Sequence, residues 1–216
     1  MSTNILLIRH GETAWNADRR LQGHIDIALN EAGLAQAAAL GQALALADEP
    51  LAAIIASDLQ RAQQTAQAVA DVKHLPVQTD PLLRERCYGA FEGLLYADIA
   101  ARYPHEYAQW QSRQIDAVMP SGERQAESFR QFYARANGAI ARWAERYDGQ
   151  TIAIVAHGGV LECAYREAVG MTLDSPRDFQ VKNASVNRFS YGDGKLHLVH
   201  WGNIEHLSAP AMDELG

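Results

Sequence analysis

The sequence is poor in cysteine, in long apolar runs and in basic charge. Its only two cysteines, Cys87 and Cys163, are too few for a disulfide framework or a zinc cluster, so a reducing cytoplasm is the expected setting. No stretch approaches the ~20 consecutive apolar residues that cross a bilayer, and the N-terminus shows no signal-peptide pattern. Lys and Arg total 19 against 26 Asp and Glu, a net charge of −7. Nucleic acid and membrane are therefore not expected as partners.

The composition is that of an ordinary globular protein. Of 216 residues, 48% are hydrophobic and 21% are charged. With no repeat and no linker, the sequence predicts one domain over residues 1–216. A small anionic substrate remains compatible with the negative net charge, because a pocket needs only a few converging cations.

Short apolar runs alternate with helical patterns along most of the chain. The runs, each typical of a buried strand, are residues 4–8, 51–55, 76–79 and 151–156. The helical patterns are residues 30–47, 57–70 and 159–169, with Asn30 and Ser57 as expected N-caps of the first two. This alternation predicts a three-layer α/β/α sandwich with a mainly parallel central sheet.

Two further regions complete the expected fold. Residues 86–147 carry aromatics, glycines and then a long helical pattern, which predicts a helical cap excursion. Residues 185–191 and 195–201 flank a Gly-Asp-Gly turn and predict a hairpin. The tail after His206 is expected to be frayed.

Two of the predicted strands end on a histidine followed by glycine, at His10 and at His157. In an open α/β sheet, ligands bind at the carboxyl ends of the strands, so the two histidines are expected to face one site. Gly158 and Gly159 also open a helix, whose N-terminus favours an anion. Either histidine alone is more simply explained as a turn residue.

Arg9 and Arg61 supply positive charge near these strand ends. Guanidinium groups bind phosphate oxygens through paired, charge-assisted hydrogen bonds, so the pattern indicates a phosphate site. A metal centre is the weaker alternative. The eight histidines show no metal-ligand spacing, and no metal is expected.

Five segments in chain order resemble the histidine phosphatase superfamily, which includes the cofactor-dependent phosphoglycerate mutases. They are RHGETxxN at residues 9–16, QGHxDxxLNxxG at 22–33, SDLxRAxxTA at 57–66, LxExxxGxxEG at 83–93 and AHGG at 156–159. Any one of them alone would be modest evidence, but their shared order makes a chance match very unlikely.

The resemblance implies catalytic roles for two residues. His10 would attack phosphorus and become a phosphohistidine, which requires its attacking nitrogen to be unprotonated and the other to donate to a main-chain carbonyl. Glu85 would protonate the leaving alkoxide and later deprotonate water. An anionic neighbour should raise the pKa of Glu85. Glu92 is a nearby carboxylate that could be mistaken for it.

The resemblance also implies the groups that bind the substrate. Three would bind the phosphate oxygens in the transition state: Arg9, Arg61 and His157. Four others are expected to line the substrate site: Asn16, Gln22, Gly23 and Gly158.

The fate of the phosphoryl group divides the family. The mutases have an adjacent arginine pair and a lysine in the cap, whereas residues 85–122 hold Arg86, Arg102 and Arg113, with no lysine and no such pair. This favours a phosphatase acting on small phosphate monoesters without a cofactor. Glu85-Arg86-Cys87-Tyr88-Gly89 nevertheless resembles the mutases' Glu-Arg-x-Tyr-Gly, and a mutase would need 2,3-bisphosphoglycerate for priming.

A non-catalytic module that binds a phosphorylated ligand is the remoter alternative, since fold alone does not determine function. A nucleophile together with an acid counts against it. The sequence leaves open the physiological substrate and the oligomeric state, a homodimer included.

Overall fold

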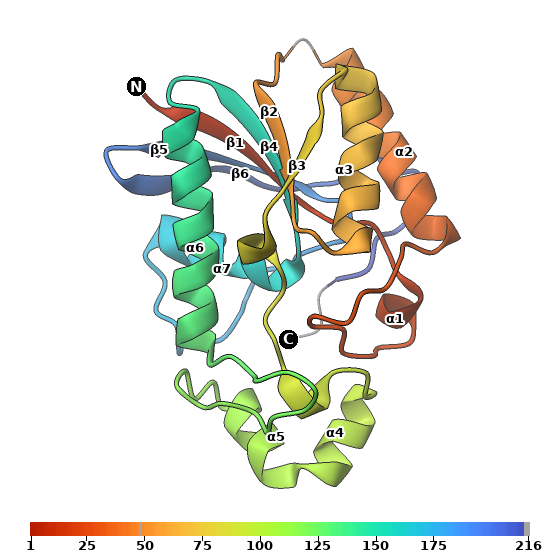
Figure 1. The fold of residues 1–216 in the computed structure, drawn as a ribbon, viewed down its shortest axis with the longest axis vertical. Coiled ribbons are helices and arrows are strands. Elements are labelled where there is room, and N and C mark those ends of the chain that lie inside the picture. The colour runs from red at the N-terminus through yellow and green to blue at the C-terminus, as the bar shows by residue number, and fades with distance from the viewer. Residues whose placement is uncertain (48, 214–216) are drawn as a thin grey trace.

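The computed structural model describes residues 1–47 and 49–213 as an α/β/α sandwich around a six-stranded sheet (Figure 1). The strand order is β3-β2-β4-β1-β5-β6. The parallel strands are β3 (Val77–Thr79), β2 (Ala53–Ala56), β4 (Thr151–Ala156) and β1 (Thr3–Arg9). The antiparallel strands are β5 (Val186–Gly192) and β6 (Lys195–Asn203). The predicted three-layer, mainly parallel fold is confirmed, as is the hairpin.

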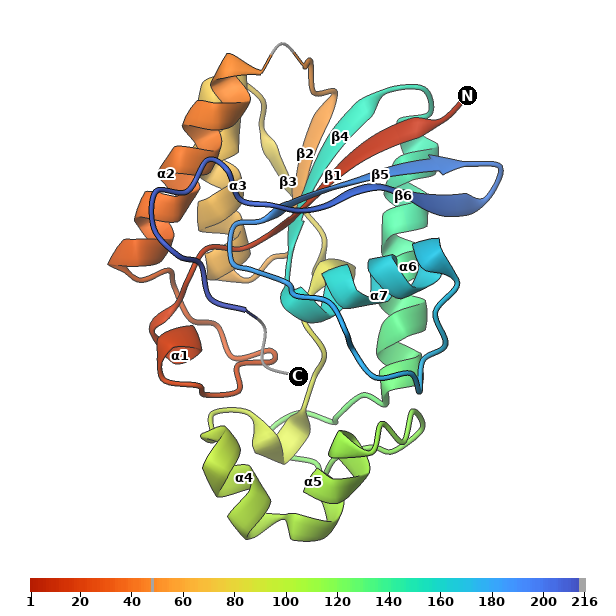
Figure 2. The same ribbon diagram turned by 180° about the vertical axis from the view of Figure 1, so that it is seen from behind.

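Helices cover both faces of the sheet, because the side chains of its strands are apolar on both faces (Figures 1 and 2). In β1, Leu6 and Ile8 belong to the cluster beneath α2 (Glu31–Leu46) and α3 (Gln60–Lys73). Ile5 and Leu7 belong to the opposite cluster, which includes side chains of α6 (Phe129–Arg146) and α7 (Gly158–Val169). This alternation follows from the two-residue period of a strand. Among the described residues, no helix combines the length and apolar character needed to cross a bilayer.

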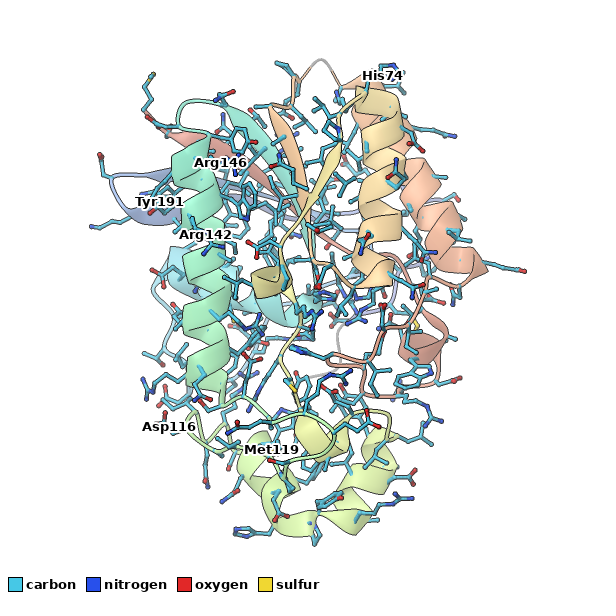
Figure 3. The ribbon with its side chains drawn as sticks, viewed as in Figure 1. His74, Asp116, Met119, Arg142, Arg146 and Tyr191 are labelled. Atoms are coloured by element: carbon cyan, nitrogen blue, oxygen red, sulfur yellow. The ribbon has the colours of Figure 1, made fainter. Side chains whose placement is uncertain are left out.

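The cap lobe, residues 86–127, is smaller than predicted. It holds η2 (Gly89–Phe91), α4 (Tyr96–Arg102) and α5 (Pro104–Gln111), and its own core includes Phe91 and Met119. Met119 lies inside this lobe and Asp116 at its outer edge (Figure 3). The predicted excursion to residue 147 is corrected, because α6 packs on the sheet. An amphipathic pattern shows that a helix has a buried face, but it does not show which layer that face meets.

Helix starts were predicted with mixed success. Asn30 is the N-cap of α2, and its Oδ1 accepts the Gly33 N–H at 2.8 Å. Ser57 is not the N-cap of α3, which begins at Gln60 after Leu59. The remaining short helices are α1 (Ala14–Ala17) and the 3-10 turn η1 (Pro81–Leu83).

The tail was predicted to be frayed, but residues 207–213 return to the carboxyl edge of the sheet (Figure 2). The Met212 carbonyl accepts hydrogen bonds from the Asn183 N–H at 2.9 Å and from Arg9 Nη1 at 3.1 Å. The Asp213 carboxylate accepts the Val181 N–H at 2.6 Å. Residue 48 and residues 214–216 lie outside the described part of the chain.

Candidate active site

The carboxyl ends of three neighbouring parallel strands meet at one edge of the sheet. His10 follows β1, Ser57 follows β2 and His157 follows β4. The His10 N–H donates to the Ala156 carbonyl at 3.0 Å, which joins the ends of β1 and β4. The His10 and His157 rings lie edge to face, with their centroids 5.2 Å apart. The strand order thus brings the two predicted histidines together.

His10 is buried, and one hydrogen bond orients its ring. Its Nδ1 lies 2.6 Å from the Gly11 carbonyl oxygen. Because a carbonyl oxygen only accepts, Nδ1 carries the proton and Nε2 keeps a lone pair. Burial, reinforced by the positive charges of Arg61 and Arg9, holds the pKa of His10 well below its ordinary value. His10 is therefore neutral at pH 7.

His157 is fully buried beside His10. Its Nε2 lies 2.8 Å from Ser57 Oγ, and its Nδ1 has no hydrogen-bond partner among the described residues. Burial, and then the charge of Arg61, lowers the pKa of His157. When Ser57 donates to Nε2, the neutral ring carries its proton on Nδ1. An anionic oxygen would satisfy that buried donor.

Arg9 is fully buried, and main-chain carbonyls orient its guanidinium group. Its Nη1 donates to the carbonyls of Val181 at 2.6 Å and of Met212 at 3.1 Å. A carbonyl has no net charge, so these two bonds place the cation without cancelling its charge. The effect of Arg9 on the pKa of His10 shows that its positive charge acts at the site.

Arg61, near the start of α3, is held in the same way. Nη1 donates to the Ile25 carbonyl at 3.0 Å and Nη2 to the Gly23 carbonyl at 2.8 Å. Gly23 has a φ of +54°, and a Cβ there would lie 2.1 Å from Glu92 Oε1. Only glycine fits this turn. Gly23 therefore positions Arg61 through its carbonyl, and it also lines the cavity that contains His10.

Glu85 is buried and lines the same cavity as His10. Its carboxylate accepts the main-chain N–H groups of Arg86 at 2.7 Å and Gly159 at 3.0 Å. A Cβ at Gly159 would lie 2.2 Å from Glu85 Oε1, so glycine is required for this contact. The N-terminus of α7 was predicted to bind the ligand anion, but its Gly159 N–H binds Glu85 instead. Gly158, the first residue of α7, is buried and does not line the cavity formed by the described residues.

Asn16 and Gln22 both line the cavity that contains His10. Asn16 Oδ1 accepts the Thr13 N–H at 3.0 Å, and Gln22 Oε1 lies 3.1 Å from Thr13 Oγ1. Because a main-chain N–H only donates, the Asn16 amide is oriented with its oxygen toward Thr13. The role of these amides as phosphate donors stays a prediction.

Three residues that position the site were given no role in it from the sequence: Ser57, His24 and Arg135. His24 Nε2 and Arg135 Nη2 contact the Glu85 carbonyl at 2.8 and 3.0 Å. Ser57 stands at a strand end, the same signal that identified His10, and could have been found. Arg135 follows a Pro-Ser-Gly-Glu segment typical of the phosphatase branch, but its contact with Glu85 spans 50 residues and is not visible in that pattern.

The described residues contain no group of three or more His, Cys, Asp or Glu side chains arranged to hold a metal ion. The cavity that contains His10 holds the carboxylates of Glu85 and Asp213 together with three arginines, Arg19, Arg20 and Arg61. Guanidinium groups match the oxygens of a phosphate group.

Comparison with known proteins identifies the family. Residues 5–204 match the histidine phosphatase superfamily, branch 1. This chain belongs to the histidine phosphatase superfamily. The metal-independent phosphoserine phosphatase of Arabidopsis thaliana is 38% identical over 99% of this chain and 87% of that protein. Phosphoglycerate mutase-like protein 4 of the same plant is 37% identical over 98% and 90%, respectively.

The fold agrees with solved structures of similar chains. YhfR of Bacillus stearothermophilus matches with a TM-score of 0.84 and 33% identity, covering 94% of this chain and 98% of that one. The family predicted from the five sequence segments is therefore confirmed, and the match to it spans almost the whole chain.

Proposed function

We propose that this protein hydrolyses small phosphate monoesters through a phosphohistidine on His10. The observation that carries the proposal is the orientation of the His10 ring. The Gly11 carbonyl accepts the Nδ1 proton at 2.6 Å, so an unprotonated Nε2 stands in a cavity that Arg61 and Glu85 also line. A module that only binds a phosphorylated ligand has no use for a nucleophile with a carboxyl group opposite.

In the first step, His10 Nε2 attacks phosphorus in line. The P–N bond forms as the P–O bond to the leaving group breaks, and the Glu85 carboxyl group gives its proton to the departing oxygen. The negative charge of the bound phosphate favours the protonated form of Glu85 beforehand. Arg9, Arg61 and His157 bind the non-bridging oxygens, with Asn16 and Gln22 as weaker donors.

In the second step, the Glu85 carboxylate takes a proton from water. The water oxygen attacks phosphorus, the P–N bond breaks, and inorganic phosphate leaves. Glu85 is then protonated again and His10 is neutral, so the enzyme is restored. Neither step uses a metal or an organic cofactor, and the name of the metal-independent Arabidopsis relative supports this.

Removal of the nucleophile tests the mechanism. The His10→Ala variant is expected to release no phosphate from a generic phosphate ester, because no other described group presents an oriented, unprotonated nitrogen to this cavity. His197→Ala, which alters an exposed histidine of β6, is the matched control and should match the wild type. Wild-type turnover by His10→Ala would contradict the proposal.

Phosphoglycerate mutase activity is the second candidate, which the similarity to phosphoglycerate mutase-like protein 4 favours. The enzyme is given 3-phosphoglycerate with 2,3-bisphosphoglycerate, beside a generic phosphate ester. We expect phosphate release to exceed isomerisation. Isomerisation much faster than phosphate release would replace the phosphatase proposal with the mutase.

The cellular setting also stays a proposal. A cytoplasmic location with a small phosphorylated metabolite as the partner is supported by the two free, buried cysteines and the net charge.

A further inference from the structure

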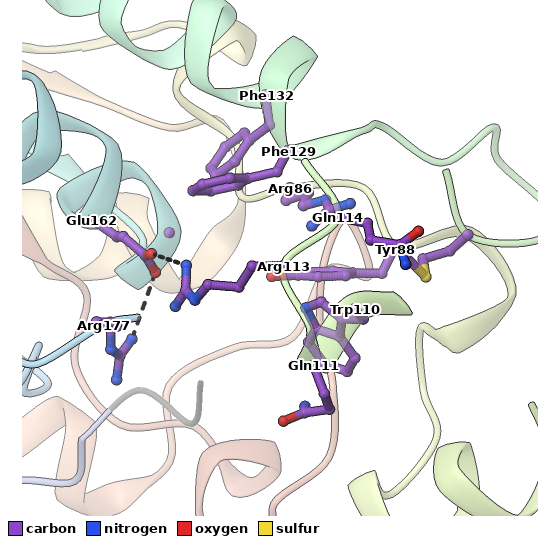
Figure 4. Close-up of a pocket in the computed structure, with 12 residues that line it drawn as sticks. Arg86, Tyr88, Trp110, Gln111, Arg113, Gln114, Phe129, Phe132, Glu162 and Arg177 are labelled. Atoms are coloured by element: carbon purple, nitrogen blue, oxygen red, sulfur yellow. Dashed lines mark hydrogen bonds and ion pairs between the residues drawn. The ribbon is translucent and has the colours of Figure 1, made fainter. Parts of the chain in front are cut away.

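A second cavity, of about 120 Å³, lies between the cap lobe and α7 (Figure 4). Gly159, whose N–H holds the Glu85 carboxylate, lines this cap cavity. Tyr88 lines both the cap cavity and the cavity that contains His10. In an in-line displacement the leaving group departs opposite the nucleophile. Glu85 is the proposed proton donor to the leaving group, and its contact with Gly159 then directs the leaving group toward the cap cavity.

The cap cavity carries an excess of positive charge. Arg86, Arg113 and Arg177 line it, against the single carboxylate of Glu162. Glu162 Oε1 lies 2.9 Å from Arg113 Nη1, and Oε2 lies 3.9 Å from Arg177 Nη1. Figure 4 shows Arg113 and Arg177 reaching Glu162 from different segments of the chain.

The same carboxylate has another partner outside the cavity lining. Arg166, one helical turn along α7 and fully buried, contacts Glu162 Oε1 at 2.8 Å. Arg177 also has a second carboxylate partner, because its Nη2 lies 3.5 Å from Asp213 Oδ1. Among the described residues that line the cavity, three arginines outnumber one carboxylate, and an anionic leaving group is favoured here.

The backbone at Arg113 is unusual for an arginine. α5 has its C-cap at Ser112, and Arg113 follows with a φ of +53°. Glycine is preferred at this position after a helix, because a side chain strains the left-handed conformation. Strain at a residue whose side chain lines a cavity points to a function of that side chain.

We propose that the cap cavity binds a carboxylate on the leaving group, which replaces Glu162 as the partner of Arg113. This inference rests on the proposed phosphatase function, because the leaving group is defined by attack from His10. Glu162 demonstrates that Arg113 holds a carboxylate. When Arg113 changes partner, Arg166 still neutralises Glu162, so no buried charge is left unpaired.

The volume of the cap cavity limits the size of the leaving group that it can bind. The cavity has about ten times the 10–15 Å³ that one water molecule needs. It suits the leaving group of a small phosphorylated hydroxy acid. Arg86 is a second cation for that group, held by the Glu127 carbonyl at 3.0 Å.

Two matched substrates test the proposal. Glycerol 3-phosphate differs from 3-phosphoglycerate in carrying CH2OH where the latter carries the carboxylate. Total consumption of each is followed by phosphorus NMR, so that hydrolysis and isomerisation both count. The wild type is expected to prefer 3-phosphoglycerate by about 10- to 100-fold in kcat/KM, the range of one charge-assisted hydrogen bond.

The Arg113→Gly variant should lose most of this preference, with kcat/KM for glycerol 3-phosphate changing less than about twofold. Glycine suits a φ of +53°, so the variant is expected to fold, which a thermal melt checks. Arg130→Gln is the matched control, because it removes an exposed arginine that pairs with Asp116. Its preference should equal that of the wild type.

Because the substrate carboxylate would replace Glu162 as the partner of Arg113, removal of Glu162 should strengthen substrate binding, whereas removal of Arg113 weakens it. Glu162→Gln removes the competing carboxylate, so KM for 3-phosphoglycerate should fall several-fold while KM for glycerol 3-phosphate stays constant. Equal losses on both substrates in Arg113→Gly would overturn the cap-cavity proposal. Hydrolysis of both by the wild type without preference would overturn it while leaving the phosphatase function intact. Failure to consume any phosphate ester would remove both proposals.

Discussion

The carboxyl edge of the sheet and the cap cavity hold their charged groups by different means. At the sheet edge the partners are main-chain atoms: carbonyls for Arg9 and Arg61, and two N–H groups for Glu85. In the cap cavity Arg113 and Arg177 are instead partnered by a charged side chain, the carboxylate of Glu162. A main-chain partner is fixed by the fold, whereas a charged side chain can be replaced by a ligand group of the same charge. The sheet edge therefore suits the common phosphoryl chemistry, and the cap cavity suits selection of the leaving group.

The sheet edge is also more tightly packed into the main core than the cap lobe is. The strands that carry His10 and His157 are buried on both faces within the main core. The cap lobe has only a small core around residues such as Phe91 and Ile99. Substitutions at the sheet edge should therefore change the rate for every substrate, and substitutions in the cap cavity should change the ranking of substrates.

Glu85→Gln is expected to lower the catalytic rate more than Ser57→Ala does. Loss of the proton donor should lower kcat by about 10²–10⁴ for an alkyl phosphate, the usual range for general acid catalysis. Formation of the phosphohistidine from p-nitrophenyl phosphate should lose far less, because nitrophenolate leaves without a proton.

Glu92→Gln is the matched control for Glu85. The Glu92 carboxylate binds the N–H groups of His24 and Tyr88 at 2.9 and 3.0 Å, so its loss should affect both esters equally. If the rates of Glu85→Gln with the alkyl phosphate and with p-nitrophenyl phosphate fall by the same factor, Glu85 is not the proton donor. The assignment of the common phosphoryl chemistry to the sheet edge would then be weakened.

Ser57→Ala is expected to have an intermediate effect. It removes the 2.8 Å contact to His157 and leaves the ring free to rotate away from the substrate oxygens. One hydrogen bond corresponds to about 1 kcal/mol, or roughly a fivefold loss in kcat/KM. The loss should be the same for carboxylated and uncarboxylated substrates, since Ser57 belongs to the sheet edge. Ser208→Ala, at an exposed serine, is the control, and unchanged kinetics in Ser57→Ala would contradict the assignment.

The last expected effect concerns the stability of the sheet edge and its dependence on pH. Burial lowers the pKa of His10 and of His157 in the folded protein, so below about pH 6.5 the unfolded state binds more protons than the folded state. The free energy of unfolding should therefore fall as the pH drops below about 6.5, by up to ~1.4 kcal/mol per group and pH unit. Urea titrations between pH 5 and 7 measure this slope. His10→Ala should lower the slope of the unfolding free energy against pH by up to ~1.4 kcal/mol per pH unit, which is the contribution of one proton. An unchanged slope would mean that His10 is not buried as a neutral group.

Much of the fold and the centre of the site could be predicted from sequence. Apolar runs identified the buried strands, and the position of His10 and His157 at strand ends identified the site, because the carboxyl ends of parallel strands share one edge. The placement of α6 could not be predicted in this way. Its amphipathic pattern fits packing on a cap as well as packing on a sheet.

The supporting contacts were harder to predict, because they join residues far apart in sequence. The Arg135 bond to the Glu85 carbonyl and the return of the tail to Arg9 at Met212 have no local pattern. Ser57 was predicted as an N-cap from its residue type, yet its hydroxyl contacts His157 across 100 residues. The residue type allows a serine to cap a helix. The strand order places Ser57 beside His157 instead.

The site of the phosphoryl group on the trapped enzyme tests the central claim most directly. The enzyme is mixed with a phosphate ester, quenched in alkali, which preserves the P–N bond, and studied by phosphorus NMR and peptide mass spectrometry. The structure predicts phosphohistidine at Nε2 of His10, because the Gly11 carbonyl engages Nδ1, and no label in His10→Ala. A phosphoryl group on His157 or Ser57 instead, or turnover without any phosphoenzyme, would contradict it.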